Sequence, residues 1–454
     1  MLKHKKLFFL ICGMIFLYAI VANAAEGVNQ KESGEIKLEA PVERLGRPLG
    51  PADIAYINRK AEEKYEQRNA EITPWVEDGS QPNPGNAALL YYEALLLIPE
   101  PNSTVYFMLG GVSEEYKPSK QLKIYMGQCL QAIELVDIAS RMQDCIWSAW
   151  PKVKRQRDAF PVRVAYLYDI LLCDAMILAT EGHYRVALER CLTIRRLTHH
   201  LSKESTTYYW FVRYLGADVR ALDIIQEILC MMPPDEDILT WLRGQLAVVE
   251  GTPPLFNECL QELVRSMLRN TRTNPDRVAR LRNMLIESAN DETTKEEVRN
   301  LTDDQLISRT GKGFQHVEDR IFRIVDSEMD VEQKLTEMQR LFNNKTKTDV
   351  VGPAVTAIMS LYNVDLKREI DVSYFEQVSH QTWVNSIKAA VEICLVAAKT
   401  GRLPEKLPDY LPRDPFTGRD FLYEITDEGF TLRCQSGDRL GRKLPHEGFI
   451  FKVK

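Results

Sequence analysis

Histidines and carboxylates are the side chains of this chain that could perform acid–base chemistry, but their spacing in the sequence matches no known catalytic motif. The adjacent His199 and His200 point about 100° apart on a helix, so they cannot share one metal ion there. The sequence contains no His-Glu-x-x-His segment, Gly-x-Ser-x-Gly elbow, phosphate-binding loop or dinucleotide glycine fingerprint. We therefore assign no catalytic, cofactor-binding or metal-binding residue, and the balance leans away from an enzyme while leaving the question open.

Several acids lie on largely apolar helical stretches and are the ones most readily drawn into the interior: Glu134, Asp169, Asp174, Asp218 and Asp223. Pairs of carboxylates that meet only in the fold can catalyse glycoside hydrolysis, so spacing alone does not exclude a hydrolase. A charge on a helix usually lies at its solvated edge, and this is our expectation for most of the five.

The cysteines permit disulfides but do not specify them. Eight remain beyond the first 24 residues, and no two are separated by the two residues of a zinc or thioredoxin-type site. Cys173 and Cys191 each lie nine residues from Gly182. An antiparallel hairpin that turns at this glycine brings them level, which makes them the candidate disulfide pair, although spacing does not decide whether their side chains face each other.

The start of the chain predicts its compartment. Lys3, Lys5 and Lys6 precede an uninterrupted apolar run over 7–21, which ends at Ala22-Asn23-Ala24. A basic start, a short apolar run and small residues at the cleavage positions are typical of a secretory leader. We predict a leader over 1–24 that is cleaved after Ala24, which gives a protein of the periplasm or cell envelope with no membrane-spanning segment in its mature form. The alternative is an uncleaved leader that anchors the chain in the inner membrane.

Charge limits the partners. The formal net charge is −6, and because 1–24 contains three lysines and no acid, the rest of the chain stands at −9. An acidic surface repels phosphate backbones, so we expect no nucleic acid partner. The partner we predict is another envelope protein.

The pattern beyond the leader predicts three further regions. Residues 25–50 are polar and rich in turn formers, which predicts a flexible lead-in. Residues 51–370 show amphipathic helical periodicity with short Pro, Gly or Asn/Asp interruptions, and short loops favour antiparallel neighbours. Residues 371–454 predict a long helix followed by a β-hairpin. The fold class is thus mainly α, with stacked antiparallel hairpins forming a bundle or irregular solenoid and a small C-terminal α+β module.

Periodicity and capping residues predict individual helices. Pro233-Pro234 ends one, and Asp235 with two further acids behind it begins the next. The clearest predicted helices span 86–98, 119–147, 160–180, 184–201, 206–231, 238–249, 254–269, 275–288, 331–342 and 374–399.

Two stretches resemble tetratricopeptide repeats. Small and aromatic residues fall at the spacing of the second repeat helix at Ala87, Tyr91, Ala94, Leu95 and Pro99. A second match begins at Gly182. Both matches are partial, and no period of 34 residues is sustained. The resemblance implies helix-hairpin packing over about eighty residues.

The last part of the chain has a different character. Leu-Pro steps at 403–412 lead into Asp414, Pro415, Phe416 and Gly418, which predict a structural turn because each proline disfavours helix. Apolar residues then alternate over 421–425 and 430–434, with a turn between them, which predicts a β-hairpin, and 448–453 can add a third strand.

This layout, from 374 to 434, resembles the C-terminal part of type II secretion major pseudopilins and similar tails of uncharacterised exported bacterial proteins. It departs from that family in having a conventional leader instead of a prepilin site, and in reducing the calcium-holding loop to Gln435-Ser436-Gly437-Asp438. Because of these departures we expect neither assembly into a fibre nor a bound cation.

These observations support three hypotheses for function. The first is an exported, non-enzymatic interaction or scaffold protein of the cell envelope. The second is an envelope hydrolase that uses paired carboxylates on an α-helical body. The third, which the tail alone suggests, is an accessory component of a secretion or pilus-like system.

Overall fold

The computed structural model describes residues 51–71, 85–110, 118–147, 154–204, 208–249, 256–343, 351–362, 366–435 and 448–452. The predicted leader (1–24) and lead-in (25–50) lie outside the described residues. Residues Ile57–Lys454 form one compact unit.

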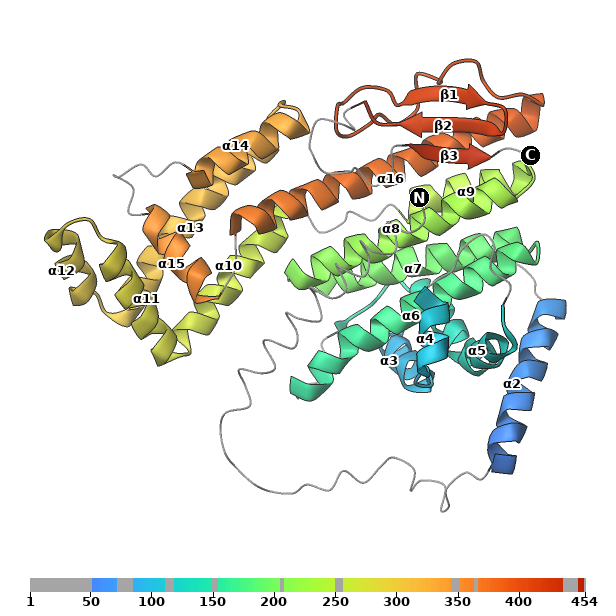
Figure 1. Ribbon diagram of the computed structural model, residues 1–454, viewed down its shortest axis with the longest axis horizontal. Helices are drawn as coiled ribbons and strands as arrows, with labels where there is room; N and C mark the ends of the chain where they lie inside the picture. The colour runs from blue at the N-terminus through green and yellow to red at the C-terminus, as the bar shows by residue number, and fades with distance from the viewer. Residues whose placement is uncertain are drawn as a thin grey trace. The chain divides into compact units, whose positions relative to one another are not determined.

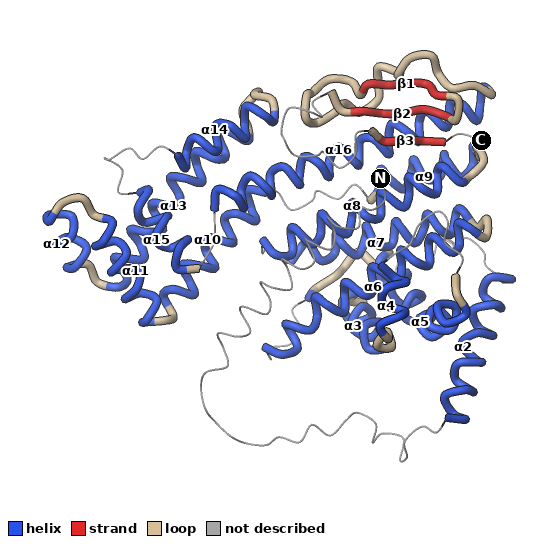
Figure 2. The backbone as a smooth tube through the Cα atoms, viewed as in Figure 1, coloured by secondary structure: helices blue, strands red, loops and turns tan. Residues whose placement is uncertain are grey.

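The predicted fold class is confirmed, because helices make up most of the described chain and the strands are confined to its C-terminal end (Figure 2). The described helices are α2 (Pro51–Glu71), α3 (Ala87–Leu97), α4 (Ser103–Gly110), α5 (Lys120–Ser140), α6 (Lys154–Thr180), α7 (Tyr184–Glu204), α8 (Tyr208–Met231), α9 (Glu236–Val248), α10 (Phe256–Arg272), α11 (Pro275–Ser288), α12 (Glu292–Asn300), α13 (Asp303–Val325), α14 (Val331–Asn343), α15 (Val351–Leu361) and α16 (Leu366–Thr400). The strands are β1 (Leu422–Thr426), β2 (Gly429–Arg433) and β3 (Phe449–Lys452).

Local sequence explains where several helices begin. The Asp235 side chain accepts a hydrogen bond from Ile238 N, as predicted for the start of α9, and the acids behind it face the positive end of the helix dipole. Thr302 and Gln305 form a reciprocal capping box at α13. Gly182 separates α6 from α7 with a φ of 84°, a left-handed conformation that glycine adopts without strain.

One predicted helix is shorter than its pattern suggested. The prediction continued from 119 to 147, whereas α5 ends at Ser140, whose hydroxyl donates to the Asp137 carbonyl. The residues that follow bond elsewhere: the Asp144 carbonyl accepts from Ala87 N, and Ile146 N donates to the Asn86 side chain. This segment therefore anchors the start of α3 and does not extend α5.

The buried apolar side chains form two cores. The first is built largely from α3 and α5–α9, and the second from α10, α11 and α13–α15. Two long helices contribute to both. In α8, Phe211 belongs to the second core and Ile225 to the first; in α16, Phe375 belongs to the second and Ile387 to the first. Helices α8 and α16 pack against each other and join the cores (Figure 1).

The strands form one antiparallel sheet in the order β1-β2-β3, which confirms the predicted hairpin and third strand. Its inner face is aromatic: Phe430 stacks on Phe451 with ring centroids 4.9 Å apart, and Phe449 meets the edge of Trp383 of α16 at 4.8 Å. The backbone of β3 is also tied to α8, because the Ile450 carbonyl accepts a hydrogen bond from the Gln226 side chain at 2.8 Å. The sheet therefore docks on α8 and α16.

Among the described residues, no helix is both long enough and apolar enough to cross a membrane.

The close approach of α2 to α5 provides a stability prediction. A Cβ added at Gly127 of α5 would lie 2.0 Å from the Ala61 carbonyl oxygen of α2, so Gly127→Ala forces the two helices apart. We expect it to lower the free energy of unfolding by about 1–3 kcal/mol. The matched control is Gly244→Ala on α9, where nothing lies within 4 Å and the better helix former should stabilise by roughly 0.5–1 kcal/mol. Urea unfolding of both variants tests the pair, and equal stabilisation would contradict the close packing.

Candidate functional site

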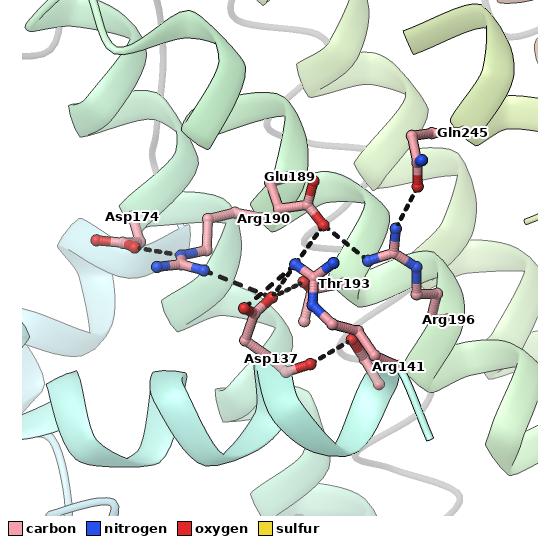
Figure 3. Close-up of polar contacts among 9 residues, drawn as sticks. Asp137, Arg141, Asp174, Glu189, Arg190, Thr193, Arg196 and Gln245 are labelled. Carbon is pink, nitrogen blue, oxygen red and sulfur yellow. Dashed lines mark hydrogen bonds and ion pairs between the residues drawn. The ribbon is translucent and has the colours of Figure 1, made fainter. Parts of the chain in front are cut away.

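The densest group of polar side chains lies among α5, α6, α7 and α9 (Figure 3). Asp137 of α5 is its centre: one carboxylate oxygen accepts from Thr193 Oγ1 at 2.8 Å and from an Arg141 guanidinium nitrogen at 3.2 Å. The same Arg141 nitrogen donates to Glu189 Oε1 of α7 at 2.5 Å. Arg141, the residue that follows α5, thus bridges a carboxylate of α5 and one of α7.

The group extends in two directions from this bridge. Towards α9, Arg196 donates to Glu189 at 2.9 Å and to Gln245 Oε1 at 2.8 Å. Towards α6, Arg190 donates to Asp174 Oδ2 at 3.0 Å, and Asp174 is fully buried. Three carboxylates and three guanidinium groups balance, which limits the cost of removing them from water.

A second charged group, smaller and more deeply buried, lies where the two cores meet. Asp218 of α8 accepts from Arg195 Nε of α7 at 2.9 Å through Oδ1, and its Oδ2 lies 2.6 Å from His380 Nε2 of α16. All three residues are at most 5% exposed. We call Arg195, Asp218 and His380 the junction triad.

The junction triad favours an ionised carboxylate. Burial alone would raise the pKa of Asp218, but the charge of Arg195 and the hydrogen bond from His380 outweigh burial and hold this pKa well below its usual range. With Asp218 ionised, His380 Nε2–H is the donor, and the buried Nδ1 has no hydrogen-bond partner in the described structure. The Tyr214 ring lies 6.1 Å from the imidazole, between centroids.

A carboxylate that orients a histidine is the arrangement found behind catalytic bases, in which the other ring nitrogen takes a proton from a nucleophile. In the described residues, no hydroxyl or thiol is hydrogen-bonded to His380 Nδ1. The contacts of the junction triad therefore link α7, α8 and α16. For His380 to accept a proton, a reactant would have to reach its buried Nδ1.

The acids singled out from the sequence have different environments. Asp174 and Asp218 are buried and ion-paired, while Asp169 pairs with Arg220 at 2.6 Å and is partly exposed. Glu134 is exposed and Asp223 half-buried, so the five do not form one site.

Sequence reasoning missed the bases that bind these acids, namely Arg141, Arg190, Arg195, Arg196 and His380. One signal was present: α7 carries charged residues at 189, 190, 195 and 196 although apolar residues surround them, which indicates charge on more than one face of the helix.

Cys173 and Cys191 are free thiols in the structure, and both are buried. Burial is the main cause that raises the pKa of each thiol, because it disfavours the charged thiolate. The disulfide between them is therefore not formed in this structure, and the pairing stays a prediction that mass spectrometry of non-reduced peptides can decide.

The residues predicted as a turn in the C-terminal module surround a buried carboxylate. Asp414 Oδ1 accepts from Phe416 N at 3.0 Å, and Oδ2 accepts from Thr417 Oγ1 at 2.9 Å. The Asp414 carbonyl accepts from Gly418 N, and Gly418 has a φ of 67°. Pro415 lies between Asp414 and the buried Phe416, whose ring packs on Phe375 of α16. The turn thereby fastens the module to the long helix.

Among the described residues, no three His, Cys, Asp or Glu side chains are grouped as a metal site would require. A shallow open hollow of about 940 Å³ lies between α12 and α13, lined among others by Glu292, Glu296, Glu297 and Arg309. Glu297 and Arg309 form an ion pair at 3.4 Å across it.

Comparison with protein-family models, curated proteins and solved structures finds no match to this chain. The likenesses to pseudopilin tails and to tetratricopeptide hairpins therefore rest on the sequence motifs alone, and what the chain does has to be argued from its own geometry.

Asp218→Asn tests the charge of the junction triad. It removes the negative charge that both Arg195 and His380 face in the buried junction triad, which we expect to cost about 3–5 kcal/mol at neutral pH. Because the pKa of Asp218 is lowered by folding, its contribution is present above the unfolded value of about 3.9 and is lost as pH falls below it. The difference in the free energy of unfolding between Asp218→Asn and the wild type should therefore become smaller at acid pH. Chemical unfolding from pH 7 to pH 3 measures this, with the exposed Asp409→Asn as control; equal stability of Asp218→Asn and wild type at neutral pH would refute it.

Glu318 of α13 provides a second test, in which folding raises the pKa of the carboxyl group instead of lowering it. Burial raises the pKa of Glu318 to about 7, and the charge of Arg265 on α10 opposes burial only in part. A raised pKa stabilises the fold below the unfolded value of about 4.5 and loses that contribution as pH rises through about 7. We expect Glu318→Gln to remove this fall in stability between those pH values, while Glu287→Gln on the exposed side of α11 leaves it in place. Thermal unfolding measured between these two pH values tests this. If stability falls with pH in Glu318→Gln as steeply as in the wild type, burial of Glu318 is not the cause of the fall.

Proposed function

We propose that this chain is an exported, non-enzymatic interaction or scaffold protein of the cell envelope. Export is supported by the basic, apolar and small-residue segments of 1–24, and the acidic remainder argues against nucleic acid partners. The packed helix hairpins support a rigid body that presents surfaces to another protein.

The observation that carries this proposal is the division of side chains between interior and surface. Inside, the carboxylates and guanidinium groups bind one another and hold helices together, as in the group around Asp137. Outside, α3 exposes large aliphatic side chains, with Leu96 79% exposed. Exposed apolar side chains grouped on one element are a feature of surfaces that contact other molecules.

The second candidate is an envelope hydrolase, and its support in the structure is limited to one pair of residues in the junction triad. Asp218 orients His380, and Nδ1 of this histidine has no partner in the described structure. The third hypothesis, an accessory role in a secretion or pilus-like system, has its support only in the sequence of the tail.

Fractionation with affinity capture tests the leading proposal. A tagged full-length chain expressed in its native host should be recovered from the envelope without residues 1–24, and chemical cross-linking should attach it to another envelope protein. Recovery from the cytosol with an intact start would contradict export. The second candidate would be supported instead if the chain hydrolysed a peptide, ester or glycoside substrate and His380→Gln abolished this activity. The variant has to keep its helical circular dichroism for this result to count.

A further inference from the structure

Helix α3 carries apolar side chains on both of its faces, one of which is buried and the other exposed. Its inner face, which includes Ala87, Tyr91 and Ala94, is at most 1% exposed and packs mainly against α5. Small side chains on that face let the two helices approach closely.

The outer face carries leucines around one acid. Leu89 is 58% exposed, Leu96 79% and Leu97 37%, and Glu93 between them is also exposed. Positions 89, 93 and 96 are four and then three residues apart, so they lie along one side of the helix. We call Leu89, Glu93, Leu96 and Leu97 the α3 stripe.

The side chain of Glu93 makes no ion pair or hydrogen bond with the described residues. It differs in this from the acids around Asp137, each of which binds a guanidinium group within the chain. A carboxylate that is flanked by exposed leucines and lacks a counter-ion is complementary to a basic group flanked by apolar ones.

Two other occupants fit less well. A second copy docked through α3 would place Glu93 beside its own counterpart between the same leucines, and like charges in contact are repulsive. An anionic lipid surface would be repelled by Glu93 and by a chain of net charge −9 beyond its first 24 residues.

We propose that the α3 stripe is a docking face for an amphipathic helix of a partner protein, in which apolar side chains one helical turn to either side flank a single lysine or arginine. The leucines bind the apolar side chains, and Glu93 pairs with the base and sets the register. The stripe is short, so the interaction is weak and transient. This inference rests on the proposed function and names the chemistry of the partner.

A charge exchange with synthetic peptides tests the docking face. The probe is a helical peptide with leucines three residues before and four residues after a central lysine, and its matched control has glutamate at the centre. Fluorescence anisotropy against the full chain should show the lysine peptide binding about fivefold tighter or more. Glu93→Lys should reverse the preference, whereas Glu134→Lys, an exposed acid on α5, should leave it unchanged. Equal binding of the two peptides, or no binding of either, overturns the proposal.

Photo-cross-linking in cells separates failure of this inference from failure of the proposed function. A benzophenone side chain at position 96 should attach to a partner peptide that carries a lysine or arginine between apolar residues, and one at the exposed Val248 serves as control. Partner capture at 248 but not at 96 overturns the docking face and leaves the scaffold function standing. Attachment at 96 to a second copy of the chain or to lipid also overturns it. Capture of no protein at either position counts against both.

Discussion

The fold depends on one buried carboxylate. Asp218 lies where the two cores meet, and an ionised side chain in that position is tolerated only because Arg195 and His380 bind its two oxygens. These three residues come from α7, α8 and α16, and two of these helices contribute apolar side chains to both cores. Because Asp218 of α8 has to stay paired with His380 of α16, the position of α8 against α16 is fixed at this point. The two cores are coupled there, since both helices contribute to both cores.

Helix α7 extends the same constraint to the rest of the first core. It is largely buried, yet its charged side chains bind in different directions: Glu189 to α5, Arg190 to α6 and Arg195 to α8. A helix held by directional ion pairs on several faces has less freedom to slide or rotate than one held by apolar contacts alone. Rigidity of this kind is consistent with the proposed scaffold function, and the close packing of α3 on α5 holds the exposed leucines of α3 in place.

Local features could be predicted from the sequence and long-range ones could not. The cap at Asp235, the turn at Gly182 and the alternation that forms the sheet are each encoded within a few residues, so their signals are readable. The end of α5 is set by Asn86, some 60 residues away, and helical periodicity continues past it. The pairing of His380 with Asp218 spans 162 residues, and no spacing rule links them. Periodicity identified which faces are buried but not which neighbour covers each, so it did not reveal the two cores. Helices α12 and α13 are not among the clearest predicted helices, although both begin at capping residues and lie in the region 51–370 that is predicted to be helical.

The central claim is that the two cores unfold as one unit because α8 and α16 join them at Asp218. Native-state hydrogen exchange, read by mass spectrometry under increasing urea, tests it most directly. We expect the slowest amides of α7 in the first core and of α13 in the second to exchange with the same opening free energy. In Asp218→Asn we expect α7 and α13 to open separately, with different free energies. Distinct opening free energies for α7 and α13 in the wild-type chain, with α8 and α16 still protected, would contradict it.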